Sequence, residues 1–387
     1  MSDLEPLATG HAIAGVLHTP SELRLRWADG RESRFAAIFL RDNCPCSACR
    51  HPQALERTFL FFDHAAPQII DARLEAGQVL CMRSVSAGEE HLSRFAGGWL
   101  RRHDPAAAGK RQQPEVHRWG AGVADALPVV DWTAYLRTDA GLRHWIEAIR
   151  STGIVLLRGI PPEPGRLLDI ARRIGPIRGS NFGEYYDVVS MPNPNASAYT
   201  AMGLELHTDL ANWASPPDIQ LLCCVKSSVQ GGESVFCDGF NVAALLREQD
   251  PEAFRLLSTE PMEFRFHDAD CDIRARAPVI ALDADGELRQ VRFNNWLRGP
   301  MVCAPDRVEA MYAALGTFWK MLRAPQNQLR IRLAPGELIA YDNHRVLHGR
   351  LPFDPSSGER HLQGCYVNRE DLESQFRLLE RRAARPA

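Results

Sequence analysis

His207-Thr208-Asp209 is the most informative stretch of this sequence. Leu347-His348-Gly349-Arg350, far downstream, supplies a second histidine that can act together with it. In an extended segment alternate side chains point the same way, so His207 and Asp209 can approach one metal ion together. Two imidazoles and one carboxylate that leave the other positions open are typical of non-haem Fe(II) sites. The two stretches therefore predict an iron site made by His207, Asp209 and His348.

The overall composition is that of an ordinary globular protein. The 387 residues are 45% hydrophobic and 24% charged, with a formal net charge of −3. This charge argues against a nucleic-acid or anionic-membrane surface, and no apolar run approaches the roughly 18–20 residues of a membrane span. The start, Met1-Ser-Asp-Leu-Glu-Pro, lacks the basic and apolar regions of a signal peptide. Ten cysteines in so long a chain do not indicate a disulfide scaffold, so we expect a reducing cytoplasm.

Residues 1–110 are predicted to form a small β domain. Leu23–Trp27 alternates in polarity, turns at Asp29-Gly30 and resumes toward Phe35, which is typical of a hairpin. A second hairpin is expected through Ala87-Gly88 to Phe95. The polar stretch 103–114 then reads as a linker, so a second domain is expected over residues 120–387.

Past the linker the sequence predicts helices and strands in alternation. Apolar residues at helical spacing and strand-like runs predict helices near 142–152, 164–174, 241–247, 251–258 and 306–323, and strands at 154–157 and 338–341. Helices mixed with short strands favour an α+β fold. Periodicity alone defines the architecture no further.

Three cysteines stand within six residues, at Cys44, Cys46 and Cys49. Such density in a reducing compartment favours a metal site over disulfides. A structural zinc site needs a fourth ligand, and the local candidates are His51, His64, Cys81 and His91. Four protein ligands leave no open position on zinc, so this site would be structural.

Several of these motifs, in the same order, are similar to those of the γ-butyrobetaine hydroxylase family, Fe(II)/2-oxoglutarate dioxygenases of the taurine-dioxygenase type. The resemblance rests on 198–200, 207–210, 220–222, 231–234 and 238–240, on 342–350 and 360–366, and on the amino-terminal cysteines. It implies a double-stranded β-helix (jelly-roll) catalytic domain with flanking helices. It also implies that His91 is the fourth zinc ligand.

The resemblance further implies a reaction and its co-substrate. Three positions on the iron would take 2-oxoglutarate and O2, and 2-oxoglutarate would be converted to succinate and CO2 as a C–H bond is hydroxylated. Arg360 matches the arginine that binds the distal carboxylate of 2-oxoglutarate, a role that suits a planar bidentate donor. Ser234 matches a nearby hydroxyl. Stimulation by ascorbate and a homodimer are also expected.

The substrate implied by the resemblance carries a trimethylammonium group. Such a group has no N–H donor, so proteins bind it on aromatic faces. The family's aromatic cage matches Phe182, Tyr186, Tyr199 and Tyr366, and its acid-binding asparagine matches Asn294. The expected reaction is γ-butyrobetaine to L-carnitine, with 2-(trimethylammonio)ethylphosphonate or trimethyllysine as alternative substrates.

Two departures from the family pattern affect the acidic end of the substrate. Ala196 stands where some butyrobetaine hydroxylases carry an acid-binding asparagine, and Trp213 lies in a segment that is usually rich in proline. Two other classes stay open: a metal-binding protein without catalysis, and a zinc hydrolase that uses the same three ligands. The complete ligand set disfavours the first, and the arginine and open geometry disfavour the second.

Overall fold

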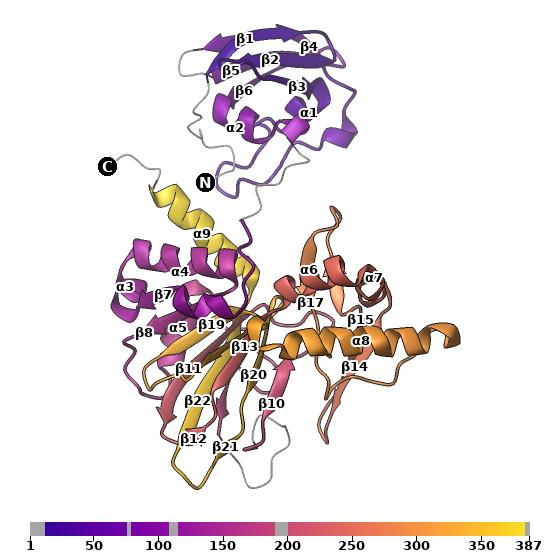
Figure 1. Cartoon of the computed structure of the whole chain (residues 1–387). Coiled ribbons are helices and arrows are strands. Elements are labelled where there is room, and N and C mark those ends of the chain that lie inside the picture. The colour runs from indigo at the N-terminus through magenta and orange to yellow at the C-terminus, as the bar shows by residue number, and fades with distance from the viewer. Residues whose placement is uncertain (1–11, 76–78, 108–114, 190–199, 384–387) are drawn as a thin grey trace. The chain divides into compact units, whose positions relative to one another are not determined.

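The computed structural model describes residues 12–75, 79–107, 115–189 and 200–383, and the chain divides into two compact units, 1–113 and 114–387. The first unit contains two three-stranded antiparallel sheets, each followed by a short helix (Figure 1). Its elements are β1 (Ile13–His18), β2 (Glu22–Trp27), β3 (Glu32–Ala36), α1 (Ala37–Asp42), β4 (Gln68–Glu75), β5 (Val79–Ser86), β6 (Glu89–Ala96) and α2 (Gly97–Arg102).

Both hairpins expected in this unit are present. Gly30 turns the chain between β2 and β3 with a φ of 84°. Ala87 and Gly88 join β5 to β6 with φ values of 50° and 86°, a pair of positive values that matches the right-handed twist of the strands. The apolar side chains of the two sheets share one core, which includes Trp27 and Phe95.

The second unit contains a six-stranded and a four-stranded sheet, whose strands cross over between distant parts of the chain (Figure 1). The large sheet has the order β7 (Val129–Asp131), β8 (Ile154–Arg158), β19 (Leu338–Asp342), β11 (Ile219–Ser227), β22 (Arg360–Val367) and β9 (Tyr185–Val188). The small sheet has the order β10 (Leu204–His207), β20 (Val346–Arg350), β13 (Ser234–Asp238) and β18 (Gln328–Ile331).

The two sheets face each other across a shared apolar interior. Phe236 of β13 meets Tyr341 of β19, with ring centroids 5.2 Å apart. Because Phe236 pairs with His348, and alternate residues of a strand share a face, His348 and Arg350 lie on this inner face. This is the double-stranded β-helix that the resemblance implied.

Helices cover the outer faces of both sheets (Figure 1). The large sheet packs on α3 (Trp132–Arg137), α4 (Asp139–Thr152), α5 (Arg166–Ile174) and α9 (Arg369–Ala383). The small sheet packs on α6 (Gly239–Gln249), α7 (Pro251–Thr259) and α8 (Val308–Arg323). The five helices expected from sequence are confirmed to within a few residues, whereas α3 and α9 were not predicted.

Three two-stranded antiparallel sheets complete the second unit. They are β12 (Gln230–Gly231) with β21 (Phe353–Asp354), β14 (Met262–His267) with β15 (Asp272–Ala277), and β16 (Ile280–Leu282) with β17 (Leu288–Val291). Within the described ranges, every helix is too short or too polar to cross a lipid bilayer.

One buried ion pair ties the second unit together. Arg345 and Asp238 approach to 2.8 Å, and their side chains are 2% and 0% exposed. Asp238 also accepts hydrogen bonds from the backbone amides of Trp119 and Phe240, so it begins α6 and anchors the segment before β7. Removing one partner of such a pair leaves an uncompensated charge in the core.

We therefore expect Asp238→Ala to lower the free energy of unfolding by about 3–5 kcal/mol, measured by denaturant titration. The matched control is Arg255→Ala, which breaks an exposed pair with Glu252 (2.6 Å). That change should cost less than about 1 kcal/mol. Equal losses in the two variants would contradict the structural role given to Asp238.

Candidate functional site: two metal centres

Across the described parts of the chain, two groups of side chains are placed to hold a metal ion. The first is in the amino-terminal unit. His91 Nε2 lies 3.2 Å from the sulfur of Cys44 and 3.6 Å from the sulfurs of Cys46 and Cys49. A tetrahedral zinc ion with its usual bond lengths would place sulfur and nitrogen ligands about 3.5 Å apart. The donor set therefore fits zinc.

The other three candidates for the fourth ligand lie elsewhere. His51 Nδ1 accepts backbone hydrogen bonds from Gln53 and Ala54, and His64 stacks on Phe59. Cys81 lies on β5, where it pairs with Arg94 across the hairpin, and it is not part of the group of metal-ligand candidates.

A buried arginine supports the zinc ligands. Arg41 Nη1 donates to the Cys49 sulfur at 3.1 Å, and its guanidinium lies 3.6 Å from the centre of the Phe59 ring. A positive charge beside a thiolate favours the ionised form that zinc requires.

The second group lies between the sheets of the carboxyl-terminal unit. Asp209 Oδ1 is 3.3 Å from His207 Nε2 and 3.6 Å from His348 Nε2. The imidazole centroids are 4.3 Å apart, because His207 on β10 pairs directly with His348 on β20. All three donors thus converge on one point from two neighbouring strands.

The protonation of these three groups suits a divalent metal. His207 Nδ1 is 2.8 Å from the carbonyl oxygen of Glu205, so Nδ1 carries the proton and Nε2 keeps its lone pair. Burial, together with the nearby His207, lowers the pKa of His348 to about 3. Burial alone would raise the pKa of Asp209, but His348, His207 and the Tyr366 hydroxyl outweigh it and hold this pKa below its ordinary range. Two imidazoles and a carboxylate are the donor types that fit Fe(II).

The backbone of Asp209 is clamped by a side chain that the sequence analysis assigned no role. Asn343 Oδ1 accepts from the Asp209 amide at 2.7 Å, and Asn343 Nδ2 donates to the carbonyl oxygens of Asp209 at 3.1 Å and of Pro217 at 2.9 Å. The next residue, Leu210, has a φ of 52°, which is a left-handed backbone conformation. For a residue other than glycine this conformation is unfavourable by about 1–3 kcal/mol. The clamp holds the chain in this conformation.

Arg360 lies on β22 with its guanidinium in the interior. Within the described residues its guanidinium has no hydrogen bond or ion pair. Gly232 leaves room for it, because a Cβ at that position would lie only 3.3 Å from Arg360 Nε. Burial lowers the pKa of Arg360 to about 10. Arg350 stands close by, and burial and the charge of Arg360 lower its pKa to about 10 as well.

Two neighbouring guanidinium groups in a partly dry environment attract an anion. Nη2 of Arg350 already donates to the backbone carbonyl oxygens of Thr200 at 2.6 Å and of Met202 at 2.8 Å, whereas Arg360 has no hydrogen bond within the described residues. Both stand over the ring of Phe353, at 4.9 Å for Arg350 and 5.5 Å for Arg360. Ser234 is buried and pairs with Arg350 across β13 and β20. A carboxylate of 2-oxoglutarate fits such a pair, because arginine donors match its two oxygens. Arg350 is a second residue with no role in the sequence analysis.

Two of the four aromatic residues assigned to the cage lie beside the metal ligands. Tyr366 Oη donates to Asp209 Oδ2 at 2.7 Å, and the rings of Tyr186 and Tyr366 are 5.6 Å apart. Phe182 packs edge-on against Phe266, with centroids 5.8 Å apart. Tyr199 lies outside the described residues, as does Ala196.

Asn294 is held by its own turn. Its Oδ1 accepts from the backbone amides of Trp296 and Leu297 at 3.1 and 3.2 Å, so its amide nitrogen is the group left to bind an acid. The Trp296 ring stands edge-on to His207 with centroids 5.5 Å apart, and it is 44% exposed. Trp296 therefore borders the metal site, a position the sequence analysis did not foresee.

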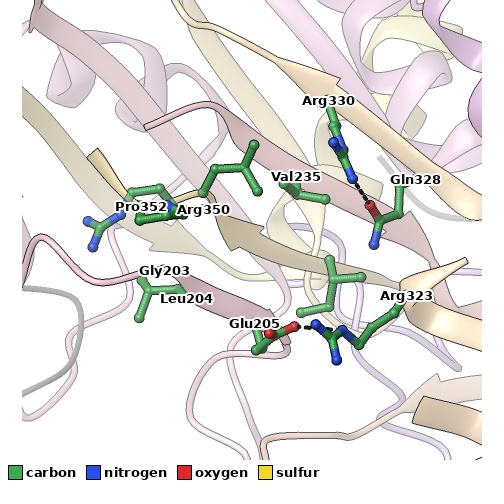
Figure 2. A pocket seen from close by; sticks show the side chains of 11 residues that line it. Gly203, Leu204, Glu205, Val235, Arg323, Gln328, Arg330, Arg350 and Pro352 are labelled. Carbon is green, nitrogen blue, oxygen red and sulfur yellow. Dashed lines mark hydrogen bonds and ion pairs between the residues drawn. The ribbon is translucent and has the colours of Figure 1, made fainter. Parts of the chain in front are cut away.

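A separate hollow of about 210 Å³ lies on the outer face of the small sheet (Figure 2). Val235 and Arg330, which line it, form a cross-strand pair and alternate with the inward-facing Ser234. Arg323 closes on Glu205 at 3.4 Å along its edge. None of the seven metal-ligand candidates lines this hollow.

Comparisons with known proteins identify the family. Residues 112–366 match the family described as taurine catabolism dioxygenase TauD, TfdA, and residues 16–78 match the gamma-butyrobetaine hydroxylase-like amino-terminal family. Since the first match spans more than half of the sequence, the chain belongs to the TauD/TfdA family of dioxygenases.

Individual relatives match over almost the whole chain. A gamma-butyrobetaine dioxygenase of Pseudomonas sp. (strain AK-1) is 41% identical over 98% of this chain and 97% of its own length. The gamma-butyrobetaine dioxygenase of Homo sapiens is 32% identical over 93% and 95%. A mitochondrial trimethyllysine dioxygenase of Gallus gallus is 31% identical over 92% and 86%.

We predict one tightly bound zinc ion per chain, and its loss on Cys49→Ser, because three donors cannot close a tetrahedral site. Elemental analysis of purified protein measures this directly. Cys81→Ala is the matched control, since it removes a buried cysteine outside the ligand group and should retain zinc. Full zinc content in Cys49→Ser, or none in the unaltered protein, would refute the assignment.

We predict that Asn343→Ala weakens both folding and iron binding. Three buried backbone groups lose their partner, so the free energy of unfolding should fall by about 3 kcal/mol. Fe(II) affinity, measured by anaerobic calorimetry, should fall by on the order of tenfold, as for other residues that orient a metal ligand.

The matched control is Asn212→Ala, which removes a fully buried asparagine with one bond of 3.3 Å, to the Ile273 carbonyl oxygen. It should change Fe(II) affinity less than Asn343→Ala does. Unchanged affinity in Asn343→Ala would mean that the clamp is dispensable for the ligand.

Proposed function

We propose that this protein is an Fe(II)- and 2-oxoglutarate-dependent dioxygenase that hydroxylates a small trimethylammonium substrate, with γ-butyrobetaine converted to L-carnitine as the leading reaction. The observation that carries this proposal is the 41% identity to a gamma-butyrobetaine dioxygenase over nearly the full length of both chains. The facial donor set and the buried guanidinium of Arg360 support it independently.

In this proposal each residue has a defined role. His207, Asp209 and His348 bind Fe(II) on one face and leave three positions open. Arg360 pairs with the distal carboxylate of 2-oxoglutarate, and Ser234 donates its hydroxyl nearby. When bound, the iron, 2-oxoglutarate and O2 supply the oxidation that yields succinate, CO2 and a hydroxylated carbon, and ascorbate is expected to stimulate it.

The aromatic residues would position the substrate. We assign the trimethylammonium cage to Phe182, Tyr186, Tyr199 and Tyr366, each face contributing about 0.5–2 kcal/mol. Burial raises the pKa of Tyr186 and Tyr366 well above the usual value, so both phenols stay neutral hydrogen-bond donors at physiological pH. Asn294 would bind the acidic end through its amide nitrogen, and the position of the bound carbon then decides which bond reacts.

We also propose how the two units divide the work. The boundary falls between residues 110 and 120, with a structural zinc in the first domain and catalysis in the second. A homodimer in the cytoplasm is the expected form. The acid group of the substrate can be a carboxylate or a phosphonate, and the trimethyllysine dioxygenase relatives give trimethyllysine a place among the candidates.

A substrate panel tests the proposal. With Fe(II), 2-oxoglutarate and ascorbate, we expect γ-butyrobetaine to stimulate succinate formation more than trimethyllysine or the trimethylammonium phosphonate does. The phosphonate giving the largest stimulation would replace the leading substrate. Stimulation only by uncharged or purely anionic compounds would overturn the aromatic cage.

Asp209→Ala is the inactive reference for this panel. It should abolish succinate formation, because two imidazoles alone hold iron poorly, while its circular dichroism and zinc content stay those of the unaltered protein. Retained turnover in this variant would exclude Asp209 as an iron ligand.

A further inference from the structure

A chain of buried hydrogen bonds leads from the central strand of the large sheet to the carboxylate of Asp209. Gln220 Nε2 on β11 donates to Tyr186 Oη at 2.8 Å. Tyr186 Oη donates to Tyr366 Oη at 3.1 Å, and Tyr366 Oη donates to Asp209 Oδ2 at 2.7 Å. The chain thus joins three strands, β11, β9 and β22, to Asp209, the second residue after β10.

The direction of this chain is set by its two ends. An ionised carboxylate can only accept, so the single hydroxyl proton of Tyr366 must point to Asp209. Tyr366 can then only accept a hydrogen bond from Tyr186, and the hydroxyl proton of Tyr186 is engaged in that bond. Tyr186 therefore needs a donor on its other side, and the amide nitrogen of Gln220 is that donor.

Gln220 is not placed there for stability. Its side chain is 3% exposed, and its Oε1 is buried with no hydrogen-bond partner within the described residues. A buried acceptor without a partner destabilises the folded state. An amide that leaves one of its two polar atoms unsatisfied, while the other orients a tyrosine, indicates a functional requirement.

The backbone of the neighbouring strand β22 also confines the Tyr186 ring. Gly364 on β22 is its cross-strand partner, and a Cβ at that position would lie 2.5 Å from two atoms of the ring. The ring therefore lies against the bare backbone of Gly364, and its hydroxyl can reach both Gln220 and Tyr366. Ring packing sets the plane of Tyr186, and the hydrogen bond from Gln220 sets the direction of its proton.

We propose that Gln220 is a positioning residue that orients Tyr186 and Tyr366 so that Tyr366 donates to the metal-binding carboxylate of Asp209. Oδ2 is then occupied, and Oδ1, the oxygen nearest both histidines, is the one presented to a metal. Resting on the proposed function, the same chain couples a cation held on the two tyrosine rings to the iron ligand, since both share Tyr366. Coupling of this kind is reciprocal: each ligand changes the affinity for the other by the same factor.

The test is anaerobic Fe(II) titration of the full-length, zinc-loaded protein by calorimetry, without substrate. Gln220→Leu removes the donor, and we expect Fe(II) affinity to fall by on the order of tenfold, with resistance to denaturant unchanged or increased. Gln220→Glu keeps the shape but replaces the donor by an acceptor, and it should weaken iron binding further. Unchanged Fe(II) affinity in both variants would overturn the proposal, as would a loss of affinity that merely follows a loss of stability.

Tyr135→Phe is the matched control. It removes another fully buried tyrosine hydroxyl, which donates to the Ile170 carbonyl oxygen at 2.9 Å among the helices outside the large sheet. It should lower stability without changing Fe(II) affinity. An equal loss of affinity in this variant would show that the Gln220 effect is unspecific and would overturn the proposal.

A second arm tests the coupling with γ-butyrobetaine as the probe. In the unaltered protein, saturating γ-butyrobetaine should change Fe(II) affinity, and Gln220→Leu should reduce that change. An equal change in both proteins would overturn the coupling. If γ-butyrobetaine does not bind at all, the proposed substrate is wrong, while the first arm still decides the positioning role of Gln220.

Discussion

The carboxylate of Asp209 is the group on which the metal site of the second unit depends, and it is fixed from three directions. Asn343 holds its backbone on both sides of the peptide, Tyr366 occupies one oxygen, and the two histidines face the other. Each of these contacts comes from a different strand or strand end. The three ligands come from the small sheet, whereas Asn343 and Tyr366, which hold Asp209, come from the large sheet. The supported ligand set therefore forms only when both sheets are in place.

The two metal centres place different demands on the chain. The amino-terminal group is built from one tight turn and one hairpin, so four ligands can surround an ion completely and add stability to a small core. The carboxyl-terminal group supplies three ligands from two neighbouring strands of one sheet and leaves room for other molecules. Beside it lies Arg360, which has no ion-pair partner within the described residues, so this centre is arranged for binding and the other for structure.

The sequence predicted the parts whose signal is local or whose motif is distinctive. His207 and Asp209 belong to one short strand end, and the two hairpins of the first unit follow from alternation and from Gly30 and Gly88. The roles of Asn343, Gln220 and Arg350 depend on contacts between strands that are far apart in the sequence, 34 residues for Gln220 with Tyr186 and 134 for Asn343 with Asp209, and no periodicity encodes such contacts. Asn343 and Arg350 lie within segment 342–350, which resembles the family motif. A polar residue in such a motif that is not itself a metal ligand could have been predicted to support one.

The order of strands in the large sheet has a consequence for synthesis of the protein. β11 lies between β19 and β22, both of which leave the ribosome long after it does. Until then the nascent chain carries the exposed edges of an almost wholly apolar strand, a state that invites wrong pairing. The first unit has no such delay, since each of its two sheets consists of three consecutive strands. During synthesis the first unit can therefore be folded while the second unit is still incomplete. Assistance from chaperones matters most in the time before β19 and β22 are synthesised.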